Sequence, residues 1–370
     1  MKEYLILSII AISLLLSGCN KLETENNSTI NITEIKDIKT IEKDTDYLCE
    51  EITDNMKIDI ELPNIQPQLG KIYEVSGRKF DLKNIAQILN IDLTDASYYI
   101  NERTGIEYFE SDEGWEISGG KGNFEYYKSE DMYEVVDTIK MAYEEELKDF
   151  SKQNMAELEN DESVIFAQRA IEDIYKPKKN ESIVIAKAMK ISKEKLQEYQ
   201  ERLVKDGVIV GTGKSDMHFV FDNLAYDNTY YLSFGITIDG IKEADQQDKY
   251  GFMLADMDTN TSCLTIDMLV EHNRVIFLYI CDAFDKNELS ENALISVQDA
   301  ISVLKDKYEL EIIPEKQLIS EVYLEYVFID DAKSNDEYEG KLIPYWCFNN
   351  TTSQCSDRIN AITGDDFQYE

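Results

Sequence analysis

Apolar residues recur along the chain with two spacings, a helical one of about 3.6 residues and a strand-like one of 2. The helical spacing predicts helices after Asp81, over 131–150, over 161–175, over 193–206 and after Ser296. Asp and Ser are common N-cap residues, because their side chains accept hydrogen bonds from backbone N–H groups of the first turn. Each of these segments carries an apolar stripe, so each helix is expected to pack against another layer.

The strand-like spacing covers most of the remaining chain. It predicts strands at 58–62, at 72–75, in three aromatic runs within 105–128, in an antiparallel meander within 207–281, and at 320–329, 341–348 and 357–363. The mixture predicts an α+β fold, with antiparallel sheets and helices packed on one face, in two to three subdomains.

Changes in composition and the positions of Gly and Pro suggest how the chain is divided into domains. The sequence predicts a signal peptide at 1–18, a flexible tether at 19–51, an N-terminal α+β domain at 52–155, a central part at 156–284 and a C-terminal α+β domain at 285–370. A length of 370 residues also favours several domains over one.

The N-terminal segment has the features of an export signal. The apolar run at 4–16 is 13 residues long, shorter than the roughly 20 residues that span a bilayer, which favours a signal peptide over a membrane helix. The sequence LSGC at 16–19 resembles the lipobox of bacterial lipoproteins. This resemblance implies acylation of Cys19 and anchoring in the lipid bilayer at the outer face of the cytoplasmic membrane. An ordinary secretory signal is the alternative.

The charge balance narrows the classes of partner. Asp and Glu number 74 against 37 Lys and Arg, which gives a formal net charge of −37. We expect no nucleic-acid partner, because the chain has too few basic residues for a surface that would neutralise phosphates. Apolar residues make up 43% of the chain, enough to build a core.

The cysteines suggest one covalent link at most. Cys347 and Cys355 flank the polar stretch FNNTTSQ and could be bridged by a disulfide across a hairpin, or both could be free thiols. No C-x-x-C pair occurs, so neither a zinc site nor a thioredoxin-type site is predicted.

Several short motifs resemble sites of chemistry, but each lacks a required residue. The GTGKS stretch at 211–215 lacks the first glycine of a phosphate-binding loop, since residue 208 is Val. The DMDTN stretch at 256–260 lacks the Thr expected in phosphatases that use an Asp nucleophile, and it lacks the spacing of a calcium loop. We therefore interpret both as turns, and we predict neither a metal nor a cofactor.

The two histidines give no catalytic arrangement. His218 lies on a strand pattern and His272 lies between two strands, and no G-x-S-x-G motif supplies a nucleophile. Both are interpreted as structural or surface residues, and no catalytic residue is predicted.

Several phrases in the C-terminal half resemble known families. They are YLSF at 231–234 with IDGI at 238–241, LIPYW at 342–346 and INAITG at 359–364. Together with the lipobox they resemble a family of uncharacterised Gram-positive lipoproteins. The C-terminal phrases are also similar to YycI-type regulators of cell-wall-stress kinases and to PepSY-type domains. The resemblance carries no catalytic residues. The residues of these phrases themselves predict an Asp-Gly turn at 239–240, an edge strand containing Pro344 and a final strand that ends at Gly364.

These observations favour binding over catalysis. The 23 Tyr and 14 Phe residues suit an aromatic surface that contacts protein or glycan. We expect an extracytoplasmic lipoprotein with a non-catalytic binding or regulatory role, which presents an open sheet edge or aromatic groove to an envelope protein or ligand. The alternatives are a carboxylate-based hydrolase and a PepSY-like protease inhibitor.

Overall fold

The computed structural model describes most of the chain beyond its first 46 residues. The described residues are 47–63, 68–129, 132–143, 158, 160–205, 228–244, 264–309, 316–330, 338–352 and 355–367. They belong to one compact unit, Thr45–Glu370. The predicted lipobox and Cys19 lie outside these residues.

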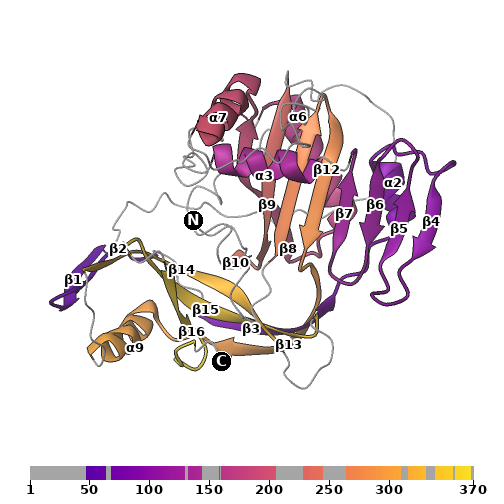
Figure 1. The fold of residues 1–370 in the computed structure, drawn as a ribbon. Helices are drawn as coiled ribbons and strands as arrows, with labels where there is room; N and C mark the ends of the chain where they lie inside the picture. The colour runs from indigo at the N-terminus through magenta and orange to yellow at the C-terminus, as the bar shows by residue number, and fades with distance from the viewer. Residues whose placement is uncertain are drawn as a thin grey trace, which may run out of the picture. The chain divides into compact units, whose positions relative to one another are not determined.

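Strands dominate the described structure (Figure 1). They are β1 (Tyr47–Thr53), β2 (Met56–Glu61), β3 (Leu69–Gly77), β4 (Ser97–Ile100), β5 (Glu107–Glu110), β6 (Glu116–Gly119), β7 (Phe124–Tyr127), β8 (Glu181–Lys190), β9 (Thr229–Ile238), β10 (Ile241–Glu243), β11 (Thr265–Glu271), β12 (Arg274–Cys281), β13 (Phe284–Ala293), β14 (Gln317–Asp330), β15 (Gly340–Asn350) and β16 (Cys355–Asn360). The helices are α2 (Leu82–Ile88), α3 (Met132–Ala142), α6 (Glu162–Tyr175), α7 (Lys193–Lys205) and α9 (Val297–Glu309).

The described strands form one hydrogen-bonded sheet of 16 strands. Its main path runs β13-β3-β15-β14-β10-β9-β11-β12-β7-β6-β5-β4, and β1, β2, β8 and β16 pair beside this path. The pairing is antiparallel except where β14 runs parallel to β10 and to β2. The α+β class is therefore confirmed, while the predicted domain boundaries stay predictions.

Helices cover both faces of the sheet around β9, where one face was predicted. Leu232 of β9 belongs to the same core cluster as Ile171 of α6, whereas Tyr231, the next residue, packs in a second cluster with Val135 of α3. Successive strand residues point to opposite faces, so this strand is sandwiched between two helices. Nine of its ten residues are buried.

Local signals explain where the helices begin and end. The Asp161 side chain accepts a hydrogen bond from the Ser163 N–H at the start of α6, and the Ser296 hydroxyl accepts one from the Asp299 N–H at the start of α9. At the β9–β10 hairpin Asp239 and Gly240 both have positive φ, 51° and 81°. This is the backbone that a two-residue turn requires, and it confirms the predicted Asp-Gly turn.

The C-terminal helix α9 and strands β14, β15 and β16 overlap the helix and three strands predicted there, with one correction. β15 pairs with β14 on one side and, on the other, first with β3 and then with β16. Pro344 is thus not in an edge strand as predicted. It lies between the last residue paired with β3, Leu342, and the first paired with β16, Tyr345. A proline, which has no N–H, fits at this change of partner.

Four strands lie where no strand was predicted, namely β1, β4, β8 and β13. β1 begins at Tyr47, inside the range 19–51 assigned to the tether, and β8 and β13 fall in stretches for which the sequence analysis proposed no strand. β8 contains a bulge between Ile185 and Lys187 that breaks its alternation. β13 is largely polar and exposed, so it lacks the apolar spacing that marks a strand.

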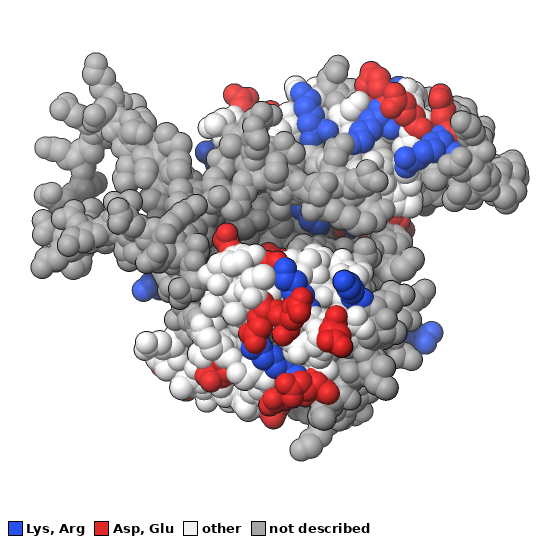
Figure 2. All heavy atoms as spheres, turned by 90° about the vertical axis from the view of Figure 1, so that its left-hand side faces the viewer, with Lys and Arg blue, Asp and Glu red and all other residues white. Residues whose placement is uncertain are grey.

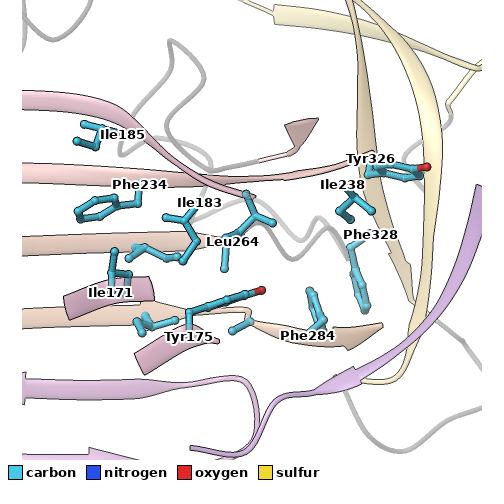
Figure 3. Packing of buried hydrophobic residues seen from close by; sticks show 14 of the residues in the cluster. Ile171, Tyr175, Ile183, Ile185, Phe234, Ile238, Leu264, Phe284, Tyr326 and Phe328 are labelled. Carbon is cyan, nitrogen blue, oxygen red and sulfur yellow. The ribbon is translucent and has the colours of Figure 1, made fainter. Parts of the chain in front are cut away.

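A continuous apolar core joins the two ends of the sheet. Figure 3 shows Tyr175 of α6, Phe284 of β13 and Phe328 of β14 in one cluster with residues of β8 and β9. The rings of Phe284 and Phe328 are stacked, with centroids 4.7 Å apart.

The exposed charges are mixed on the face drawn in Figure 2, where acidic and basic side chains of described residues lie next to one another. Ion pairs also join α9 to its neighbours, including Lys307 Nζ to Asp357 Oδ1 at 2.9 Å. No helix among the described residues has the length and apolar character to cross a bilayer.

A buried group of charges connects strands that are distant in the sequence. Lys286 of β13 places its Nζ 3.2 Å from Glu181 Oε1 on β8 and 3.0 Å from Glu243 Oε2 on β10. These three side chains are 2%, 1% and 3% exposed. Arg78, which follows β3, lies over the Tyr175 ring at 3.9 Å and donates to the Tyr175 carbonyl.

The two carboxylates respond differently to this environment. Burial opposes the charge of Glu181, but Lys286, the Lys178 N–H and Arg78 together hold its pKa below the usual value. For Glu243 burial outweighs the attraction of Lys286 and raises the pKa. Burial also opposes the charge of Lys286, yet Glu243, the Tyr175 hydroxyl that accepts from its Nζ, and Glu181 together raise its pKa. The ammonium therefore stays charged in the core.

We predict that Lys286→Met costs about 3–5 kcal/mol of unfolding free energy, because Glu243 loses its ion-pair partner and Glu181 keeps only Arg78, at 3.9 Å. Urea denaturation measures this. The control Lys71→Met removes a half-buried lysine whose ion-pair partners, Asp239 and Glu288, are exposed to solvent, and it should cost less than about 1 kcal/mol. Adding Glu243→Gln to Lys286→Met should recover part of the loss. Equal effects of Lys286→Met and Lys71→Met would contradict this assignment.

Candidate functional site

The last strand of the sheet path is short, uncharged and exposed. β4, with the sequence SYYI, ends the path and pairs with β5. Tyr98, Tyr99 and Ile100 are 51%, 42% and 49% exposed. We call residues Ser97–Ile100 the β4 edge.

The backbone of the β4 edge offers hydrogen-bonding groups on its outer side. The Asn101 N–H donates to the Ile106 carbonyl at 2.9 Å, which continues the register in which Tyr99 lies opposite Tyr108. Hydrogen-bonded and non-hydrogen-bonded pairs alternate in an antiparallel ladder. The backbone N–H and C=O groups of Tyr99 are therefore hydrogen-bonded to β5, while those of Tyr98 and Ile100 point away from β5.

The other described strands with a single ladder partner all carry charged residues. These are β1 with Glu50 and Glu51, β8 with Glu181, Lys187 and Lys190, β13 with Asp285, Lys286, Glu288 and Glu291, and β16 with Asp357 and Arg358. Charges on an edge discourage pairing with another chain. The β4 edge is without this protection.

The exposed tyrosines are held in place by their neighbours. The Tyr98 ring lies 4.9 Å from the Phe109 ring, and the Tyr99 ring stacks on Tyr108 at 4.8 Å. The Tyr98 hydroxyl donates to Glu107 at 3.0 Å, and the Tyr99 hydroxyl donates to Glu110. Such pairing preorganises the edge, because the rings lose little further freedom on binding.

The two faces of this part of the sheet differ in chemistry. Tyr98 and Ile100 lie on the face of Phe109, which continues into the main core beside α2. The opposite face carries the exposed or half-buried side chains of Tyr99, Tyr108, Glu110, Glu116, Glu125 and Tyr127. We call these six residues the Tyr–Glu face.

The Tyr–Glu face is acidic. β4 to β7 contain four Glu and no Lys or Arg, and Glu110, Glu116 and Glu125 form no ion pair with another described residue. The Tyr127 hydroxyl donates to Glu116 Oε2 at 2.7 Å. Burial and the charge of Glu116 raise the pKa of Glu125 to about 7, although the Ser118 hydroxyl opposes the shift. A cation at this face would relieve that repulsion.

The structure leaves most of the sequence-derived candidates untested. Cys19, the stretches 211–215 and 256–260, and His218 lie outside the described residues. His272 is exposed in the β11–β12 turn, where it and Asn273 have positive φ. Among the residues that the structure describes, no group of three His, Cys, Asp or Glu side chains is placed to hold a metal ion.

The disulfide also stays a prediction. Cys347 lies opposite Arg358 and Cys355 lies opposite Asn350 in the β15–β16 ladder.

The β4 edge was not predicted from the sequence. The aromatic runs within 105–128 predict hairpins, but the sequence analysis predicts no strand at 97–100. A signal was present: Tyr98, Tyr99 and Ile100 have high strand propensity, and they lie in an uncharged stretch between Asp95 and Asn101, which suit turns.

Comparison with known proteins gives a likeness of fold. No protein-family model and no curated protein matches the chain. The crystal structure of an uncharacterized protein from Eubacterium rectale is similar to it with a TM-score of 0.54 at 12% identity, over 88% of this chain and 94% of that one. The Bacillus megaterium YpeB C-terminal domain overlaps with a TM-score of 0.32 at 13% identity, over 80% of this chain and 98% of that domain. The first match shows a shared fold, whereas the TM-score of the second is too low to show one.

We predict that Glu125→Gln stabilises the protein at pH 8 and has little effect at pH 5. The pKa of Glu125 rises from 4.5 to about 7 on folding, so stability falls as the pH rises between these values. After allowance for solvent screening, the gain at pH 8 is about 1–2 kcal/mol. Thermal or urea denaturation at both pH values measures it. Glu113→Gln, in the β5–β6 turn, is the matched control, and an equal gain at both pH values would contradict the assignment.

Proposed function

We propose that this protein is a lipid-anchored lipoprotein at the outer face of the cytoplasmic membrane, with a non-catalytic binding role. The β4 edge pairs with an extended segment of an envelope protein, which adds a strand to the sheet. The observation that carries this proposal is the uncharged edge with two outward-facing backbone positions, Tyr98 and Ile100.

Charge identifies the kind of partner. The chain has a net charge of −37, and the strands beside the edge carry Glu without Lys or Arg. Like charges across an interface disfavour binding, so the segment is basic and a second copy of this acidic chain is disfavoured. The protease-inhibiting role implied by the PepSY resemblance is a special case, in which the partner is a protease.

A carboxylate-based hydrolase is the second candidate. Glu116 and Glu125 are diagonal neighbours on β6 and β7, a relation that places Cβ atoms about 7–8 Å apart or somewhat less. Carboxyl groups about 6.5–9.5 Å apart serve inverting glycosidases, and the raised pKa of Glu125 suits a general acid. Hydrolysis would require both carboxylates and would not require the β4 edge.

The lipid anchor is tested by Cys19→Ser. We expect the variant to leave the membrane fraction or to accumulate as a precursor that retains the signal peptide, because no thiol is available for acylation. Globomycin should have the same effect on the unaltered protein. Membrane fractionation with mass spectrometry of the N-terminus measures this, and an unchanged product in the membrane fraction would refute the anchor.

The edge is tested by Ile100→Pro, with Ile100→Val as control. Proline removes the outward N–H without breaking a bond to β5, and valine keeps the N–H. A photo-crosslinking residue in place of Tyr98 should capture an envelope protein on intact cells, and Ile100→Pro should weaken capture about tenfold, the effect of one lost hydrogen bond in a paired edge. Ile100→Val should capture normally. The proposal fails if Ile100→Pro, shown by circular dichroism to be folded, captures as well as the unaltered protein.

A further inference from the structure

A strand that pairs with the β4 edge must place its side chains alternately on the two faces of the sheet. The two faces beside this edge are different, as described above. The added strand therefore needs a different kind of side chain at odd and at even positions. This inference rests on the proposed function and specifies the sequence class of the partner.

One set of positions meets a surface that is apolar apart from Glu107, which lies opposite Ile100 and accepts a hydrogen bond from the Tyr98 hydroxyl. Tyr98 and Ile100 are about half exposed and lie on the Phe109 side of the sheet. They are also the residues whose N–H and C=O groups would bond to the new strand. Side chains directly opposite them would cover these apolar groups, so Val, Ile or Leu fits there.

The intervening position meets the Tyr–Glu face. Tyr99 points to this face and its hydroxyl donates to Glu110. In the new ladder Tyr99 would be a non-hydrogen-bonded position, where facing side chains come closest. A cation there lies over an aromatic ring and next to a carboxylate.

The distances suit a long basic side chain. Strands are spaced about 4.8 Å apart, so the new strand lies roughly 10 Å from β5. A Lys or Arg side chain that extends from the new strand across β4 can reach the carboxylate of Glu110, which extends from β5 toward it. Glu116, on the next strand along, adds negative potential.

We propose that the partner segment alternates apolar and basic residues, with an Arg or Lys opposite Tyr99 and apolar residues opposite Tyr98 and Ile100. A segment of the same composition with its basic residues grouped together cannot satisfy both faces, because some cations then meet the apolar face.

Two synthetic peptides of equal composition test this, one alternating Val and Arg and one with the residues in blocks. Fluorescence anisotropy with the full chain should show that the alternating peptide binds about tenfold more tightly. Glu110→Gln should weaken its binding about two- to fivefold at low salt, the range of an exposed ion pair. Glu113→Gln makes the same charge change in the β5–β6 turn and should leave binding unchanged.

The outcomes separate this inference from the proposed function. If both peptides bind equally and Ile100→Pro weakens both, the edge binds strands but the alternation is wrong. If both bind and Ile100→Pro weakens neither, the β4 edge is not the site and the proposed function also fails. An alternating Val–Glu peptide that binds as well as the Val–Arg peptide would overturn the assignment of charge.

Discussion

One buried ammonium group connects parts of the sheet that are otherwise joined at few points. Along the main path of the sheet, β13, β3, β15 and β14 are connected to β9 only through β10. The ladder between β10 and β14 consists of two residue pairs. Lys286 adds a link there, since it reaches from β13 to Glu181 on β8 and Glu243 on β10. Charges in a core cost desolvation energy, and their best-attested benefit is that they allow only one arrangement. We infer that Lys286, Glu181 and Glu243 together fix how β8, β10 and β13 are arranged beside the short β10–β14 ladder.

The strand at the other end of the path, β4, differs from β13 in its charge. Near β13 the sheet has buried charges and a charged edge, whereas at β4 it has an edge without charge and a negative face beside it. A short strand limits unwanted association, and hydrogen bonds from Tyr98 and Tyr99 to glutamates keep the exposed rings polar at their tips. An edge of this kind stays soluble and still presents two free backbone positions. This arrangement is the reason that we propose binding rather than catalysis.

Local features could be predicted from the sequence and non-local ones could not. α6 and the β9–β10 turn follow from residues a few positions apart, a cap at Asp161 and the pair Asp239-Gly240. β13 and β8 were missed because one is polar and the other is bulged. The prediction that Pro344 lies in an edge strand used only the property that proline has no N–H to donate. The structure accommodates Pro344 where β15 changes its partner from β3 to β16, and this change depends on residues distant in the sequence. For the same reason nothing in the sequence brings Glu181 and Lys286 together.

Amide hydrogen exchange, resolved by residue, tests the central claim most directly. In the free protein the N–H groups of Tyr98 and Ile100 should exchange quickly, since they face away from β5, and that of Tyr99 should be protected. When a basic strand-forming peptide binds, Tyr98 and Ile100 should become protected together, because strand addition bonds both. A bound peptide that leaves both amides exchanging at the free rate would contradict the account.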